Sequence, residues 1–348
     1  MARYDLDRDA VAAAVDRAAP GAPRYRADQV WEGLYRLRVG PDELTSLPLP
    51  VRRALAADPA LAAALSCEQE VSADGGATRK WVWRLADGAR VESVLMYAPG
   101  RATVCVSTQA GCAMACGFCA TGQAGFTRHL TPGEIVEQVA RAGRDVTHVV
   151  FMGMGEPLAN YDATWAAVRR LHGDFGLSAR RLTISTVGIV PGIRRMADED
   201  LPVNLAVSLH AADDALRDEL VPINRRYPLA ALAAACRDYV DATHRRLSFE
   251  WALMAGVNDR PSDAAALAAF ARPLAAHVNL IPLNPTPGYP VQGSPPAAVR
   301  AFRDALRSHG ANVTVRRPRG RDIDAACGQL AGQAPPRSAG RAPATCHT

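Results

Sequence analysis

Three cysteines stand close together in the chain, Cys112, Cys116 and Cys119, with the spacing C-x-x-x-C-x-x-C. Cysteine thiolates are the usual ligands of iron–sulfur clusters, and a cubane 4Fe-4S cluster takes one ligand for each iron. Three clustered cysteines therefore leave one iron open to a molecule that is not protein. The spacing predicts that these three residues hold a single 4Fe-4S cluster.

An open iron of this kind can chelate S-adenosylmethionine (SAM). The cluster can then deliver an electron that cleaves SAM and gives a 5′-deoxyadenosyl radical, so the pattern indicates a radical SAM enzyme. The alternatives are a zinc knuckle or a set of buried thiols. Zinc requires a fourth ligand at close spacing, and the nearest histidine, His129, lies ten residues beyond Cys119.

The composition is typical of a globular protein that is not secreted. The chain has 348 residues, 49% of them hydrophobic, which is enough for one large domain and a small one. We expect a cytoplasmic protein without a membrane segment, because no apolar run has the length of a membrane span and the N-terminus lacks a signal-peptide core. Eight unevenly spaced cysteines favour metal or redox chemistry over a disulfide scaffold.

Arginine carries almost all the positive charge, because Lys80 is the only lysine in a chain of net charge +5. The arginine side chain binds phosphate bidentately and stacks on bases, which suits RNA. Candidates for contact with an RNA backbone are Arg225, Arg226, Arg245, Arg246, Arg316, Arg317, Arg319 and Arg321. For any single pair, a solvated surface is the simpler interpretation.

Residues 1–70 are predicted to form a small helical accessory domain that binds RNA, because Ala-rich helical stretches alternate there with Pro and Gly breaks. One helix face would carry Val30, Trp31, Leu34 and Tyr35. A β-hairpin follows, in which residues 80–85 and 90–96 flank an Asp-Gly turn. Residues 71–100 are thus predicted to form a hairpin linker, which carries Glu92.

From about residue 102, strands alternate with helices in the pattern of parallel β/α units. Six candidate strands cover residues 102–107, 148–152, 182–186, 203–209, 247–253 and 278–283. A capping box, Thr131 with Glu134, predicts the start of the first helix after the cysteines. The expected fold is therefore α/β, a partial (β/α)6 barrel over residues 101–332 with a C-terminal extension. The Pro- and Ala-rich tail, residues 333–348, is predicted to be disordered.

Chemistry in such barrels lies on the loops after the C-terminal ends of the strands, and the cysteine loop follows the first strand. Gly155 and Glu156 follow the second strand, where exposed backbone and a carboxylate could receive the amino group of SAM. The ends of the third, fourth and sixth strands carry further candidates, Ser185, Ser208, Leu209, His210 and Asn284. Capping or turn formation is the alternative role for each polar residue.

Two more cysteines lie outside this loop: Cys105 in the first strand, seven residues before Cys112, and Cys327 near the C-terminus. From spacing alone each is equally well a buried small hydrophobe, and nothing in the spacing pairs them. Cys67, Cys236 and Cys346 have no neighbouring motif, and we interpret Cys236 as helix core.

Several motifs together resemble the RlmN/Cfr family of radical SAM RNA methyltransferases. They are Cys105-Val-Ser-Thr-Gln-Ala-Gly-Cys-Ala-Met-Ala-Cys-Gly-Phe-Cys119, Gly153-Met-Gly-Glu-Pro157, Ser208-Leu-His210, Val221-Pro-Ile-Asn224, Asn279-Leu-Ile-Pro282 and Asp322-Ile-Asp-Ala-Ala-Cys-Gly-Gln-Leu330. The resemblance runs from about residue 24 to residue 332 and is looser in the N-terminal domain.

The resemblance implies a methyl-carrier mechanism with the cluster and SAM as cofactors. One SAM would methylate Cys327, and the radical from a second SAM would remove hydrogen from that methyl group. The methylene radical would add to C2 of adenine, an electron-poor carbon that cannot attack SAM as a nucleophile. Glu92 matches the proton acceptor. Cys105 matches the thiol that resolves the adduct by forming a disulfide with Cys327.

The implied partners are 23S rRNA, tRNA methylated at the adenosine 3′ of the anticodon, and an external flavodoxin- or ferredoxin-type electron donor. A monomer is expected. Cfr-like methylation of C8 of the same rRNA base is the nearest alternative, because it uses the same catalytic residues. Two other classes stay open from the residues alone: a non-catalytic RNA-binding protein with structural zinc, and a radical SAM enzyme acting on a small molecule.

Overall fold

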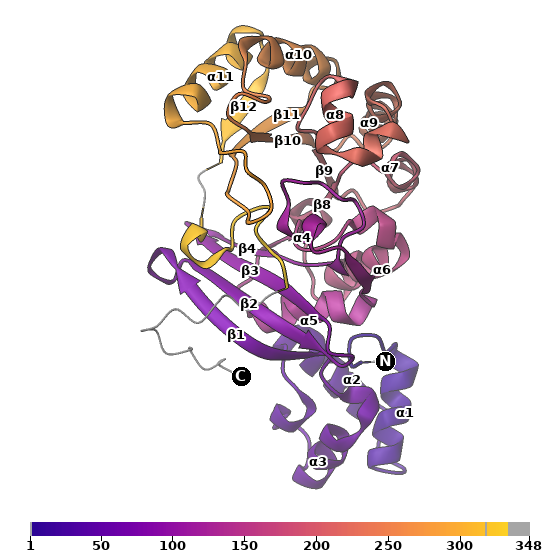
Figure 1. Ribbon diagram of the computed structural model, residues 1–348. Coiled ribbons are helices and arrows are strands. Elements are labelled where there is room, and N and C mark those ends of the chain that lie inside the picture. Colours follow the sequence, from indigo (N-terminus) through magenta and orange to yellow (C-terminus); the bar gives the residue numbers. More distant parts are fainter. Residues whose placement is uncertain (1, 317–318, 333–348) are drawn as a thin grey trace, which may run out of the picture.

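A ten-stranded sheet forms the centre of the protein, in the order β1-β2-β3-β4-β7-β8-β9-β10-β11-β12. The computed structural model in Figure 1 describes residues 2–316 and 319–332. From β4 to β12 neighbouring strands are parallel, whereas β1, β2 and β3 form an antiparallel meander that joins β4. The bounds are Leu65–Ala73 (β1), Thr78–Leu85 (β2), Arg90–Ala98 (β3), Arg101–Cys105 (β4), His148–Phe151 (β7), Leu182–Thr186 (β8), Asn204–Ser208 (β9), Leu247–Leu253 (β10), His277–Pro282 (β11) and Asn312–Val315 (β12).

The predicted α/β fold with a partial barrel is confirmed. The six predicted strands are β4 and β7 to β11, and their ends differ from the prediction by at most two residues. The predicted hairpin is formed by β2 and β3, with Gly88 in the turn at a φ of 87°.

Four strands were not predicted from the sequence: β1 and β12 of the central sheet, and the short strands β5 (Gln109–Gly111) and β6 (Phe126–His129), which pair with each other. Strand β12 has only four residues, too few for a periodic pattern to stand out. Strand β1 has mostly polar, partly exposed side chains because it is an edge strand of the sheet. It begins within the range 1–70 that the sequence assigns to the helical domain.

Helices connect the parallel strands and cover one face of the sheet (Figure 1). They are α5 (Pro132–Ala142), α6 (Tyr161–Gly173), α7 (Val190–Ala197), α8 (Asp214–Leu220), α9 (Leu229–Thr243), α10 (Pro261–Ala271) and α11 (Pro296–Ser308). The predicted capping box begins α5: Thr131 Oγ1 accepts a bond from the Glu134 N–H at 3.2 Å, and the Glu134 carboxylate accepts one from the Thr131 N–H at 2.9 Å. Cys236 is buried in α9, as predicted.

The N-terminal helices α1 (Arg8–Ala18), α2 (Tyr25–Glu32) and α3 (Leu49–Ala57) pack at the end of the molecule near β1 and α5 (Figure 1). The four residues predicted to share a helix face are all buried. Trp31 Nε1 donates to Asp174 Oδ1 at 3.2 Å, and Arg170 of α6 donates to the Tyr35 hydroxyl. The accessory helices are therefore attached to the barrel through α6.

Residues 319–332, which we call the C-terminal segment, cross β2 and β3 on the face that the helices leave open (Figure 1, yellow). Gly320 N donates to Asp74 Oδ2 at 3.1 Å, and Lys80 Nζ donates to the Asp324 carbonyl at 3.3 Å. These contacts place Cys327 over the sheet. The predicted tail, with Cys346, lies outside the described residues. No helix within residues 2–316 and 319–332 combines the length and apolar character of a membrane span.

Candidate active site

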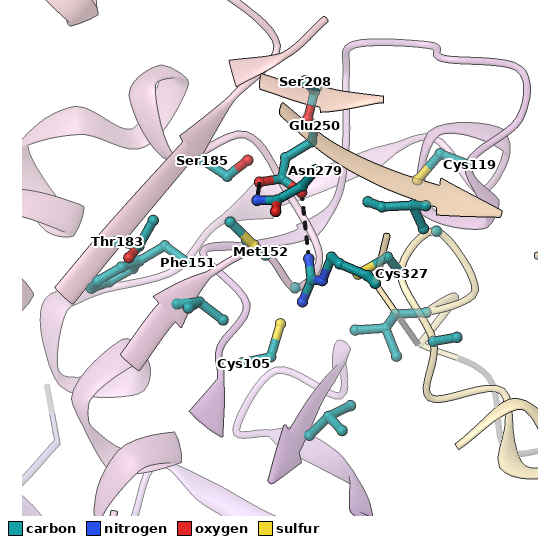
Figure 2. A pocket seen from close by; sticks show the side chains of 18 of the residues that line it. Cys105, Cys119, Phe151, Met152, Thr183, Ser185, Ser208, Glu250, Asn279 and Cys327 are labelled. Atoms are coloured by element: carbon teal, nitrogen blue, oxygen red, sulfur yellow. Dashed lines mark hydrogen bonds and ion pairs between the residues drawn. The ribbon is translucent and has the colours of Figure 1, made fainter. Parts of the chain in front are cut away.

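A cavity of about 840 Å3 lies between the strands of the barrel, the cysteine loop and the C-terminal segment (Figure 2). It brings together most of the residues singled out in the sequence. These are Cys105, Cys112, Cys116, Cys119, Gly155, Glu156, Ser185, Ser208, His210, Asn284 and Cys327. Glu92 and Leu209 are not among the described residues that line it.

The cysteine loop runs from the short strand β5 (Gln109–Gly111) to the short helix α4 (Ala120–Gln123). Burial raises the pKa of Cys112 to about 12. Burial also raises the pKa of Cys116, and the neighbouring sulfurs of Cys119 and Cys112 add to this. The three thiols thus lie within electrostatic reach of one another, and a bound cation would favour their thiolate forms.

The cysteine loop is packed against the C-terminal segment. Ala120 N donates to the Gly328 carbonyl at 2.8 Å, and the Thr121 hydroxyl donates to the Leu330 carbonyl. A Cβ atom on Gly122 would lie 2.8 Å from the Cys116 carbonyl oxygen, so the loop needs glycine there. This packing holds Cys327 beside the loop that carries the three cysteines.

Gly155 and Glu156 form a tightly packed turn after β7. Gly155 has a φ of +97°, and a Cβ there would lie 2.5 Å from the Gln109 Cβ. The buried carboxylate of Glu156 accepts bonds from Leu158 N at 3.0 Å and from Val187 N at 2.8 Å. Burial raises its pKa to about 7, although these N–H groups oppose the shift. Each oxygen can accept another bond, so contact with a SAM amino group stays a prediction.

His210 occupies the end of β9 as a neutral ring. Burial lowers its pKa to about 3, and the nearby Arg217 charge contributes. Its Nδ1 accepts a bond from Ala252 N at 3.0 Å, which leaves Nε2 as the protonated nitrogen. Ser185 and Ser208 line the cavity at the ends of the neighbouring strands (Figure 2).

Leu209 differs from its neighbours. Its side chain is fully buried, its N–H donates to the Glu250 carbonyl at 3.0 Å, and its carbonyl accepts a bond from Arg217 at 3.1 Å. All its groups are thus engaged within the protein. Contact of Leu209 with SAM stays a prediction.

Cys105 and Cys327, which the spacing could not pair, face the same cavity (Figure 2). Asn284 Nδ2 donates to the Cys327 carbonyl at 3.1 Å and so ties the loop after β11 to the C-terminal segment. Burial raises the pKa of Cys105 to about 12; the sulfur of Cys327 adds to this, and Arg316 opposes it. The two thiols therefore influence each other directly.

Arg316 lines the cavity, and 34% of its side chain is exposed. The charge of Cys327 raises its pKa most, and Glu250 and Cys105 contribute. Its Nη1 lies 3.5 Å from Glu250 Oε2, and Glu250 Oε1 accepts a bond from Asn279 Nδ2 at 2.8 Å (Figure 2). Its place in the cavity could not be predicted because strand β12, which directly precedes it, was missed; contact of Arg316 with RNA stays a prediction.

Glu92 lies on β3 beneath the C-terminal segment, and both its oxygens are engaged. Oε2 lies 3.1 Å from Lys80 Nζ, with 1% and 2% of the two side chains exposed. Oε1 accepts bonds from Ala331 N at 3.1 Å and from Gly332 N at 2.8 Å. The carboxylate thus binds the C-terminal segment. Lys80 could not be recognised from the sequence as part of the site, since its one notable feature there is that it is the only lysine.

Comparison with known proteins identifies the family. Residues 106–268 match the radical SAM superfamily. A probable dual-specificity RNA methyltransferase RlmN from Parafrankia sp. (strain EAN1pec) is 52% identical, and the match covers 97% of this chain and 93% of that protein. The chain belongs to the RlmN family of radical SAM RNA methyltransferases. A second RlmN, from Chloroflexus aurantiacus, is 52% identical over 90% of this chain and 88% of its own length.

A solved structure agrees with this family. The radical SAM methyltransferase from Sphaerobacter thermophilus superposes with a TM-score of 0.89 at 49% identity, covering 96% of this chain and 100% of that one. The protein is therefore a SAM-dependent radical SAM RNA methyltransferase, with a 4Fe-4S cluster and SAM as cofactors. The predicted family and class of enzyme are confirmed.

The donor set of the cavity fits these cofactors. Among the described residues no group of His, Cys, Asp or Glu converges on a single metal position. A cubane cluster, however, binds each thiolate to a different iron, so Cys112, Cys116 and Cys119 need not converge on one point. Gly155 lines the cavity beside them, and its missing side chain lets the turn pack against Gln109. Cys112, Cys116 and Cys119 would hold the cluster, and the loop at Gly155 would hold SAM.

Proposed function

We propose that the protein methylates C2 of an adenosine in 23S rRNA, and of the adenosine 3′ of the anticodon in tRNA. The observation that carries the proposal is that Cys105 and Cys327 line one cavity together with the three cysteines of the loop. An enzyme that used SAM only as a radical source would not need these two additional thiols.

In the proposed mechanism Cys327 is the methyl carrier. Its thiolate attacks the methyl carbon of one SAM, so that a new S–CH3 bond forms as the methyl–sulfonium bond breaks and S-adenosylhomocysteine leaves. Once bound, the cluster and a second SAM supply a 5′-deoxyadenosyl radical. Cys327 then loses a hydrogen atom from its methyl group, and the resulting methylene adds to C2 of the adenine. Asn284 holds the Cys327 backbone during these steps.

Release of the product is assigned to Glu92 and Cys105. Glu92 takes the C2 proton, and the Cys105 thiolate attacks the Cys327 sulfur. The S–CH2 bond breaks with its electron pair on the carbon, which takes up a proton to become a methyl group, and the two sulfurs form a disulfide radical anion. Its unpaired electron would pass to the cluster, which was oxidised when SAM was cleaved, and leave a neutral disulfide. Because Glu92 binds Ala331 and Gly332 here, its action as a base requires the C-terminal segment to shift.

The remaining partners belong to the same proposal. RNA is the substrate in the cytoplasm, a flavodoxin- or ferredoxin-type protein donates the electron, and the enzyme acts as a monomer. Methylation at C8 would use the same residues, so the position of the methyl group is decided by experiment.

The test is mass spectrometry of nucleosides from rRNA and tRNA of cells with and without the gene. Loss of 2-methyladenosine in the deletion strain is expected, and its persistence would refute the proposal. Loss of 8-methyladenosine instead would establish the Cfr-like alternative. If a Cys327→Ala variant retains full activity on any substrate, the methyl-carrier role is wrong and the small-molecule class is favoured.

A further inference from the structure

Four arginines line the end of the cavity that is remote from the cysteine loop. Arg101 begins β4, Arg180 lies in the turn before β8, and Arg245 and Arg246 directly precede β10. We call them the arginine quartet. Because these strands are parallel, their N-terminal ends meet at one edge of the sheet, opposite the edge that carries the cysteine loop.

The positive charge of the quartet is not neutralised by carboxylates. In the part of the chain that the structure describes, none of its guanidinium groups forms an ion pair. The two carboxylates that line the cavity are engaged elsewhere, Glu156 with backbone N–H groups and Glu250 with Arg316. The quartet thus presents four positive charges to one cavity without a counterion.

The neighbours of the quartet leave its donors available. Arg101 Nε donates to Thr103 Oγ1 at 2.9 Å, and one Arg245 Nη donates to Asn204 Oδ1 at 3.1 Å. Arg245 Nε is buried without a hydrogen-bond partner. Burial lowers the pKa of Arg101, and the like charges of Arg316 and Arg246 lower it further. A bound anion would relieve this repulsion.

We infer that the arginine quartet binds phosphodiester groups of the RNA on either side of the nucleotide that enters the cavity. The planar guanidinium matches a phosphate with paired N–H donors, and RNA is the polyanion that this enzyme modifies. The inference rests on the proposed function, because it assumes that a nucleotide of the RNA reaches Cys327.

The distance along β4 is suitable for this arrangement. Arg101, Thr103 and Cys105 all line the cavity, so they project from the same face of the strand. Four residues of strand span about 13 Å at 3.3 Å per residue. This leaves room for one nucleotide between a phosphate at the quartet and a base at the two sulfurs. The RNA thus enters from the edge opposite the cysteine loop.

The test measures binding of a labelled RNA hairpin, with an unpaired adenosine in its loop, to the cluster-loaded enzyme. The variants are Arg245→Gln with Arg246→Gln, and Arg101→Gln with Arg180→Gln as an independent pair. The control pair, Arg300→Gln with Arg307→Gln, removes equal charge from exposed positions of α11 that do not line the cavity. Iron content and circular dichroism like those of the wild type establish folding.

Either quartet pair should weaken binding roughly tenfold, since two charge-assisted contacts are lost. Each lost phosphate contact should reduce the magnitude of the slope of log K against log salt by about 0.7, so a double variant should lose about 1.4 from the slope. When salt is raised from about 50 to 200 mM, the wild-type affinity should therefore fall about sevenfold more than the affinity of the double variant. Neutral methylphosphonate linkages beside the adenosine should weaken RNA binding by the wild-type enzyme about as much as the substitutions do. The same linkages should change RNA binding by the quartet variants little.

Wild-type affinity and salt slope in both quartet pairs, while the wild type methylates the hairpin, would overturn the inference and leave the proposed function intact. An equal loss of RNA affinity in the Arg300→Gln, Arg307→Gln control would overturn the inference too, because the net charge of the protein, and not the position of the arginines, would then explain the effect. If the wild-type enzyme neither binds nor methylates the RNA, the proposed function fails, and the inference fails with it.

Discussion

The buried pair of Lys80 and Glu92 allows a quantitative test of what holds the C-terminal segment over the sheet. The two charges lie 3.1 Å apart with 2% and 1% of their side chains exposed. At an effective dielectric constant of about 20 their attraction is about 5 kcal/mol. Replacing Lys80 by Met leaves a buried carboxylate with only the N–H groups of Ala331 and Gly332 as partners. Breaking such a pair on one side costs about 3–5 kcal/mol.

This loss should be visible in thermal unfolding of the cluster-loaded enzyme, followed by circular dichroism under anaerobic conditions. For 348 residues the unfolding entropy is about 0.7 kcal/mol/K, so Lys80→Met should lower Tm by about 4–7 °C. Arg79→Met, at the exposed neighbouring position on β2, is the matched control and should change stability by about 0.5 kcal/mol or less.

A double-mutant cycle separates the pair from other effects of the substitution. Lys80→Met combined with Glu92→Gln removes both charges, so the double variant should be more stable than Lys80→Met alone. If Lys80→Met has the same Tm as the Arg79→Met control, the ion pair does not stabilise this region and the reasoning is wrong. The same holds if the double variant is no more stable than Lys80→Met.

Three further predictions concern the chemistry. Cys105→Ala should accumulate a covalent protein–RNA adduct, detectable on denaturing gels, whereas Cys236→Ala, a change in the core of α9, should turn over normally. Burial raises the pKa of Cys105 to about 12, so its thiolate fraction should rise about tenfold per pH unit between pH 7 and 9. The rate at which the wild-type adduct decays in single-turnover experiments should rise by the same factor. A decay rate that does not change with pH would contradict this. Gly155→Ala should weaken SAM binding in equilibrium dialysis, because its Cβ would lie 2.5 Å from the Gln109 Cβ at a positive φ and would displace the turn that lines the cavity; unchanged affinity would remove this turn from the SAM site.

The sequence predicted the parts of the fold that leave a periodic or punctuated pattern. The β/α units have buried strands and capped helices, so strands such as Leu182–Thr186 and Leu247–Leu253 were located to the residue. Edge and short strands leave no such pattern, which is why β1 and β12 were missed. The omission mattered, because β12 carries the chain to Arg316 and so turns an apparent surface arginine into a neighbour of Cys105 and Cys327.

The residues of the candidate site likewise fall into those that could be predicted from the sequence and those that could not. The spacing of Cys112, Cys116 and Cys119 predicts their chemistry because the ligands are close in the sequence. Cys105 and Cys327 are separated by more than two hundred residues, and only the resemblance to a family paired them before the fold placed both on one cavity. Lys80 could not be assigned a role, since its partner Glu92 lies on the neighbouring strand in a register that sequence alone does not fix.

The hydrogen bonds of Glu92 connect stability with the proposed catalysis. The residue assigned to take the C2 proton binds Lys80 and two backbone N–H groups, and those N–H groups belong to the segment that carries Cys327. A shift of residues 331–332 would free one carboxylate oxygen, while Lys80 would keep the other oxygen paired. Lys80 would thus hold Glu92 in place when the C-terminal segment moves. If that is so, Lys80→Met should slow release of methylated RNA more than it slows methylation of Cys327, a difference that loss of stability alone would not produce.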